Sequence, residues 1–187
     1  MTVESLRNQI QQAIALGGPV AVVIADSIAE LDYREVDGYS AARAARVVKR
    51  KSLAIRGLLA EALAALNNPP VVVLGWSDVQ DPTYATQHAC IEQAFERSHE
   101  FQAEVLTILD QYLERRRRTL DQPARLRLAR YLLAELPTFI DGIRHNGIAY
   151  RALLCETFGS RGMQDFALAI VRNKYDLGLQ CHEVAFL

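Results

Sequence analysis

Apolar positions along the chain follow two alternating patterns. Residues 20–24 and 71–74 are short, continuous apolar runs bounded by glycine, proline or asparagine, which is typical of buried strands in a parallel sheet. Between them, apolar residues recur at helical spacing from Ala41 to about Leu66. A strand, a helical crossover and a second strand predict a βαβ unit. The chain is therefore expected to form an α/β fold with a mostly parallel sheet.

Helical spacing also predicts elements on both sides of this unit. Ser5 is expected to cap an opening helix, and Ser40 to cap the long crossover helix. Residues 85–118 keep helical spacing throughout and form either one long helix or a broken pair. Another helix is expected from about residue 123 and to continue past Pro137, because a proline mainly disrupts the helical bonds upstream of it.

Polar residues follow the predicted strands. Asp26 comes directly after the first strand, and residues 27–40 are expected to be a loop. Residues 147–155 form a further strand that ends at Cys155, followed by Glu156. Ligands of open α/β sheets bind at the carboxyl ends of the strands, so these side chains are candidate ligand contacts. For Asp26, a cap of a loop or helix is an equal alternative. For Cys155, a buried strand thiol is favoured, because the Glu156 anion would disfavour the thiolate.

The helix from residue 123 carries a phenol and a carboxylate on an otherwise apolar face. Tyr131 and Glu135 are four residues apart, which places them on one side of the helix about a turn apart. An unpaired polar group out of water costs about 1–3 kcal/mol. Two interpretations are open: a partly exposed glutamate beside a tyrosine whose hydroxyl reaches solvent, or a buried pair that meets a substrate.

Composition limits the class of protein. The 187 residues, 50% of them apolar, suit a single domain over 1–187. No apolar run is long enough for a membrane span, and no signal-peptide block opens the sequence, so a cytoplasmic protein without membrane contact is expected. Three widely separated cysteines indicate neither a disulfide framework nor a metal site. Neither a metal nor a cofactor is expected.

The net charge of −1 conceals two strongly basic segments. The crossover helix has an exposed face that carries Arg43, Arg46, Lys49, Arg50, Lys51 and Arg56. Because a solvated helix face usually mixes charges of both signs, this face is expected to bind the phosphates of a polyanion. Aromatic residues are not interleaved with these bases, which favours a backbone reader over a protein that stacks bases. The second segment covers residues 115–130. Its four arginines at 115–118 are a further phosphate contact or only a solvated helix end.

Several short sequence segments, taken in their order along the chain, resemble segments of the tRNA-dependent cyclodipeptide synthases. They are the 20–26 strand with Asp26, Tyr33 and the 38–40 turn before the basic helix, the 74–78 segment with Trp76 followed by Tyr84, and the 131–137 segment. The resemblance covers about residues 6–156, leaving 157–187 as a divergent extension. It implies a Rossmann-like three-layer fold, like the catalytic domain of class I aminoacyl-tRNA synthetases.

The resemblance also implies roles for individual residues. Tyr131 and Glu135 would hold the α-amino group of an aminoacyl moiety, with Glu135 also moving protons. Tyr84 occupies the position of another tyrosine in the family's aminoacyl pocket, and the basic helix corresponds to the family's tRNA-binding helix. The implied function is transfer of an aminoacyl group from aminoacyl-tRNA to form an amide bond, by a monomer or a weak homodimer.

Two departures from the family pattern keep an alternative open. The family's Gly-x-Ser-x-x-Asn segment, whose serine carries the aminoacyl ester, is not found before Asp26, and Ser5 with Asn8 is too close to Asp26 to replace it. Cys155 and Glu156 stand where the family has Tyr-His or Tyr-Pro. Ser27, Cys155 or the Cys181-His182 pair could supply another nucleophile, or an amine could attack the ester directly. The alternative function is a catalytically degenerate protein that binds tRNA or an amino acid. A generic nucleotide-binding protein is disfavoured, because no glycine-rich loop follows the first strand.

Overall fold

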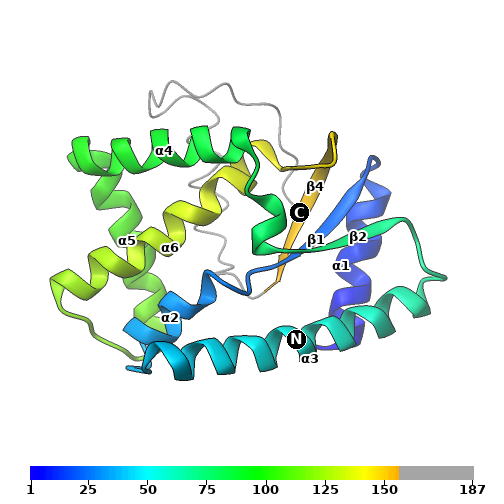
Figure 1. The fold of residues 1–187 in the computed structure, drawn as a ribbon, viewed down its shortest axis with the longest axis horizontal. Helices are drawn as coiled ribbons and strands as arrows, with labels where there is room; N and C mark the ends of the chain where they lie inside the picture. Colours follow the sequence, from blue (N-terminus) through cyan, green and yellow to red (C-terminus); the bar gives the residue numbers. More distant parts are fainter. Residues whose placement is uncertain (156–187) are drawn as a thin grey trace.

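The computed structural model describes residues 1–155 (Figure 1). Its four-stranded sheet has the order β2-β1-β4-β3. β1 (Val20–Ile24) pairs in parallel with both β2 (Val71–Gly75) and β4 (Ile148–Cys155), and β3 (Ile143–His145) pairs antiparallel with β4. All five residues of β1 are buried, because β1 has a strand on each side and helices on both faces. The parallel sheet and the βαβ unit are confirmed.

Helices make up most of the described chain. They are α1 (Val3–Ala15), α2 (Ala29–Glu35), α3 (Ala41–Ala65), the short 3-10 helix η1 (Trp76–Val79), α4 (Pro82–Arg97), α5 (His99–Arg115) and α6 (Gln122–Asp141). Among the described helices, none has both the length and the apolar character that a membrane span requires.

Alternate residues of β1 define the two faces of the sheet. Val22 and Ile24 pack into a cluster with residues of α1 and α3. Ala21 and Val23 pack on the other face, in a cluster that contains Trp76 of η1 and is covered by Tyr84 of α4. Because side chains alternate along a strand, one five-residue strand supports both helical layers. The expected three-layer arrangement is confirmed.

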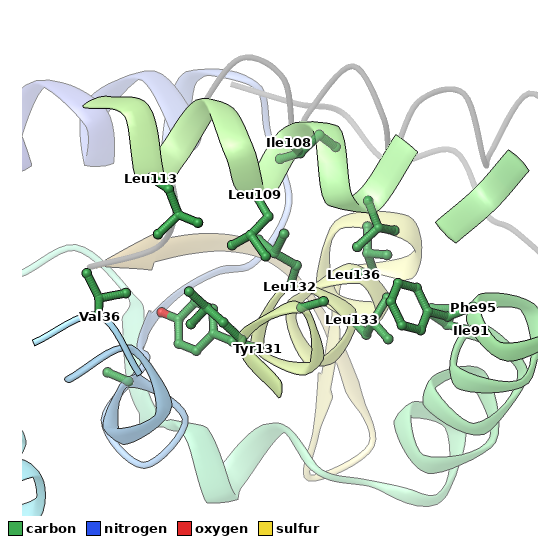
Figure 2. Close-up of a cluster of buried hydrophobic side chains, with 14 of the residues drawn as sticks. Val36, Ile91, Phe95, Ile108, Leu109, Leu113, Tyr131, Leu132, Leu133 and Leu136 are labelled. Atoms are coloured by element: carbon green, nitrogen blue, oxygen red, sulfur yellow. The ribbon is translucent and has the colours of Figure 1, made fainter. Parts of the chain in front are cut away.

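The largest apolar cluster lies beside the sheet, among the helices. It joins α2, the first half of α3, α4 and α5 around α6 (Figure 1). Figure 2 shows side chains of α6 in this cluster, with Tyr131 at the end near Val36 and Leu113. The second half of α3 packs instead against α1 and β1. α3 therefore connects the helical cluster to the sheet, and α6 is the central helix of the cluster.

Several expectations about local structure are corrected. The cap of α1 is Thr2, whose hydroxyl accepts from the Ser5 backbone N–H, so Ser5 is not the cap. Residues 27–40 include the helix α2, which has no side-chain cap to reveal it in the sequence. Of the two possibilities for residues 85–118, the broken pair is correct: Ser98 ends α4 and caps α5.

The structure also revises the predicted strands. β2 is only partly buried over its first three residues, because it lies at the edge of the sheet. β3 was not predicted, since three residues are too few for a recognisable pattern. Two other expectations are confirmed: Ser40 caps α3, and α6 continues past Pro137.

Candidate functional site

Helix α6 carries both members of the predicted pair into the interior. Asp121 caps its first turn by accepting from the Ala124 N–H at 2.8 Å. Tyr131 is 2% exposed and Glu135 is fully buried. The interpretation of a partly exposed glutamate is therefore wrong. The helix around the pair is packed by α2, α4 and α5, which is why both polar groups are withdrawn from water.

The Glu135 carboxyl group is unusual in its surroundings. Neither of its oxygens forms a hydrogen bond of full geometry with a described residue, although the Tyr131 phenol lies close to them. Burial raises its pKa well above the ordinary value, and the neighbouring Tyr131 phenol opposes this shift. Burial, and then the charge of Glu135, raises the pKa of Tyr131. A buried carboxyl group with a raised pKa is suited to binding an ammonium group or to exchanging a proton with a substrate.

Tyr84 places the beginning of α4 beside Glu135 of α6. Its hydroxyl donates to the Ala134 carbonyl oxygen at 3.0 Å, one residue before Glu135. Burial, with smaller contributions from the Glu92 and Glu135 charges, raises the pKa of Tyr84 to about 12. Its ring meets Trp76 edge-on, with centroids 6.1 Å apart, and stacks on His88 at 5.7 Å. Tyr84 and Glu135, which are distant in sequence, are thus neighbours.

Asp26 links the carboxyl ends of β1 and β2. Its Oδ1 accepts from the backbone N–H groups of Ser27 and Trp76, both at 2.9 Å. The link orders the start of η1, and with it the Trp76 indole. Asp26 therefore holds the two strand ends together, and a direct substrate contact by Asp26 remains a prediction.

Cys155 lies at the same edge of the sheet. It is the last residue of β4 and pairs in register with Ile24, two residues before Asp26. Glu156, Cys181 and His182 lie outside the described residues. The roles predicted for Cys155 and Glu156 remain predictions.

The predicted cationic face is present on α3. All six of its bases, Arg43, Arg46, Lys49, Arg50, Lys51 and Arg56, are exposed. Within residues 1–155, Arg43, Arg46, Lys49, Arg50 and Arg56 form no ion pair with an acidic side chain. We name this group of six residues the α3 cationic face.

The other basic segment differs, because folding pairs most of its charges. Arg116 and Arg118 approach Asp37 at 3.5 and 3.6 Å. Further along, Arg125 pairs with Asp110, Arg127 with Glu35, and Arg130 with Glu92. Within residues 1–155, the α3 cationic face therefore keeps more of its charge available for a partner than the second basic segment does.

The sequence comparison now decides the family. The model of the cyclodipeptide synthase family matches residues 1–155. The chain belongs to the cyclodipeptide synthase family. A comparison with curated protein sequences gives no match.

Solved cyclodipeptide synthases share the fold of this family member. A Mycobacterium tuberculosis protein, whose description relates cyclodipeptide synthetases to type I tRNA synthetases, superposes with a TM-score of 0.67 at 19% identity, covering 90% of this chain and 70% of that one. AlbC, a cyclodipeptide synthase from Streptomyces noursei, superposes with a TM-score of 0.65 at 19% identity, covering 90% of this chain and 92% of AlbC. A cyclodipeptide synthase from Bacillus thermoamylovorans superposes with a TM-score of 0.73 at 17% identity, covering 95% of this chain and 77% of that one. At these identities the likeness establishes the Rossmann-like fold alone.

Aromatic rings accompany the α3 cationic face of this family member, contrary to the sequence-based expectation. Arg43 lies over the Tyr39 ring at 3.9 Å, and Lys51 over the Tyr33 ring at 4.8 Å. The two rings stack on each other with centroids 6.2 Å apart. The sequence did not reveal this arrangement, because α2 and the turn after it, rather than α3 itself, supply the tyrosines.

A buried acid of α2 was also missed. Asp32 is 9% exposed and accepts from the Tyr112 hydroxyl of α5 at 2.7 Å. Arg116 donates to that same hydroxyl oxygen at 3.0 Å. Burial raises the pKa of Asp32, and the Tyr112 hydrogen bond and the Arg116 charge oppose the shift. In the sequence Asp32 lay in a predicted loop, and nothing local marked it as buried.

Proposed function

We propose that this family member transfers an aminoacyl group from aminoacyl-tRNA to an amine and forms an amide bond, as a cyclodipeptide synthase does. The observation that carries the proposal is the Glu135 carboxyl group, fully buried beside Tyr131 without a hydrogen-bond partner in the described part of the chain. An unpaired buried polar group is costly. The α-ammonium group of an aminoacyl moiety supplies the donors that this carboxylate lacks.

The chemistry needs only a positioned acid–base group. The amine attacks the ester carbonyl carbon, a C–N bond forms, and the bond to the ribose oxygen of tRNA breaks. The amine must lose a proton, and the ribose oxygen gains one. Glu135 holds the α-ammonium group of the aminoacyl moiety, accepts the proton that the attacking amine loses, and passes it to the ribose oxygen. Tyr131, one helical turn away, orients the same amino group with its hydroxyl.

The α3 cationic face is assigned to the tRNA backbone. Its six bases are exposed, and five of them have no acidic partner among residues 1–155. Phosphates would release counterions on binding such a face. Cyclodipeptide synthases as a family use aminoacyl-tRNA, which agrees with a polyanionic partner here.

A product assay tests the proposal. The full chain is incubated with a mixture of charged tRNAs, products are identified by mass spectrometry, and deacylation is followed in parallel. Glu135→Gln should abolish product, while Glu96→Gln, which changes an exposed carboxylate of α4, should not. Cys155→Ala tests for a thiol nucleophile: retained product means that no thioester forms.

A second candidate, a protein that binds charged tRNA or an amino acid without reaction, has a distinct outcome. Tight binding of tRNA with neither product nor deacylation by the wild-type chain would favour it and reject the transferase. The mass of a product further separates a cyclodipeptide from a single amide made with another amine.

A further inference from the structure

A second unsatisfied polar group lies near Glu135. The Trp76 side chain is fully buried, yet its indole Nε1, although it lies near the Tyr84 hydroxyl, forms no hydrogen bond of full geometry with a described residue. An indole N–H can only donate. Buried tryptophans usually place this N–H on an acceptor. The Trp76 donor therefore requires an explanation of its own.

Tyr84 connects this donor to the Glu135 acceptor. The Tyr84 ring contacts the Trp76 indole edge-on, and its hydroxyl is bonded to the carbonyl oxygen of Ala134, next to Glu135. Trp76, Tyr84 and Ala134 belong to one packed cluster. Tyr84 therefore lies near both a buried donor and a buried acceptor, and the donor and the acceptor do not bond to each other.

The position of the indole is fixed by the backbone. Trp76 directly follows β2, and its backbone N–H donates to Asp26 Oδ1 at the end of β1. The carboxyl ends of parallel strands are where ligands of such sheets bind. The indole is therefore held at the ligand-binding edge by a hydrogen bond between the two strand ends.

We propose that the Trp76 indole N–H donates to the carbonyl oxygen of the aminoacyl group whose ammonium group binds Glu135. An aminoacyl ester carries its donor, the ammonium, and its acceptor, the carbonyl oxygen, on adjacent carbon atoms. It supplies in one ligand the two partners that the site lacks. The same N–H would face this oxygen as it gains negative charge during attack by the amine. The assignment rests on the proposed function, since it takes an aminoacyl group as the ligand.

The composition makes the assignment directly measurable, because Trp76 is the single tryptophan of the chain. The indole N–H of the 15N-labelled full chain therefore gives a single signal in a heteronuclear NMR spectrum. The probes are 3′-aminoacylamino-3′-deoxyadenosines for each of the twenty amino acids, which keep the ammonium group and the carbonyl but do not react. The matched probes have the carbonyl reduced to CH2.

The carbonyl probe that binds should shift the indole proton downfield, and its reduced counterpart should not. Trp76→Phe should weaken the carbonyl probe about tenfold, the usual value of one hydrogen bond, and leave the reduced probe within twofold. Glu135→Gln should weaken both probes, because both keep the ammonium group. The wild-type NMR result does not depend on the folding of any variant.

Other outcomes overturn the assignment. If a carbonyl probe binds in a Glu135-dependent manner while the indole signal stays in place, the proposed function stands and the Trp76 contact is wrong. If Tyr84→Phe shifts the indole signal without ligand and the carbonyl probe does not, the N–H already bonds Tyr84 and is structural. If no probe binds, the aminoacyl site itself is wrong, and the proposed function falls with it.

Discussion

Tyr84 donates its hydroxyl hydrogen to the carbonyl oxygen of Ala134 at 3.0 Å, and so ties α4 to α6 one residue before Glu135. This part of α6 is weakened by Pro137, whose missing N–H removes one helical hydrogen bond. The next carbonyl, that of Glu135, accepts from the Thr138 hydroxyl at 2.7 Å. Two side chains therefore bond to the α6 backbone where the proline weakens it.

Tyr84→Phe removes the bond between α4 and α6 and keeps the aromatic packing. We expect a loss of about 1 kcal/mol in the free energy of unfolding, the usual net value of one hydrogen bond, measured by urea denaturation. We also expect lower amide-forming activity, because the backbone that carries Glu135 loses a support. Tyr150→Phe, at a half-buried position of β4, is the matched control. Equal stability of Tyr84→Phe and wild type would contradict the role assigned to this bond.

Glu135→Gln should stabilise the fold increasingly as pH rises. Because burial raises the pKa of folded Glu135 above its ordinary value of 4.5, the folded state binds more protons than the unfolded chain above that pH, and wild-type stability falls. Glutamine does not titrate. The advantage of the variant should be absent below pH 4.5 and then grow by up to about 1.4 kcal/mol per pH unit until the folded carboxyl ionises. Urea denaturation of both proteins from pH 4 to pH 8 measures it, and parallel profiles would show that Glu135 is not perturbed.

The double variant Arg46→Glu, Lys49→Glu should weaken tRNA binding by tenfold or more. Both side chains are exposed members of the α3 cationic face, and neither has an acidic partner among the described residues. Losing two phosphate contacts should also lower the slope of log affinity against log salt concentration by about 1.5. A filter-binding titration at several salt concentrations measures both quantities.

Arg97→Glu is the control for this pair. Arg97 is an exposed base of α4, which lies on the other side of the sheet from α3 (Figure 1). Its substitution should change affinity by less than threefold. Similar losses in both variants would mean that the overall charge, rather than the α3 cationic face, attracts tRNA.

Gly75→Ala should destabilise the fold by about 1 kcal/mol through overpacking, although the extended backbone of Gly75 suits any residue. An added Cβ would stand 3.0 Å from Asp26 Oδ2, and Asp26 is already held by the backbone N–H groups of Ser27 and Trp76. Thermal unfolding measures the change. Gly57→Ala is the opposite control: it lies in the interior of α3 with nothing within 4 Å of its Cβ position, so alanine should stabilise the helix by about 0.5–1 kcal/mol. If Gly75→Ala stabilises the fold as Gly57→Ala does, the end of β2 is not crowded.

Strong local patterns made much of the fold predictable. β1 and β2 are uniformly apolar, and Ser40 begins a long helix with one apolar face, so their positions follow from side-chain periodicity. α2 and β3 escaped prediction, because seven and three residues carry too little periodicity and their pairing or packing partners are far along the chain. The order of the strands likewise depends on contacts that no local pattern contains.

For the site, helical spacing alone predicts which chemical groups share a helix face: Tyr131 with Glu135 on α6, and six bases on α3. The environments of these groups depend on tertiary packing. Packing around α6 removed Glu135 from water and left it without a partner in the described chain. Folding paired Arg125 with Asp110 and Arg127 with Glu35 but left five bases of α3 without such partners among residues 1–155. Burial and ion pairing depend on residues brought together from distant parts of the chain, and spacing along one helix cannot encode them.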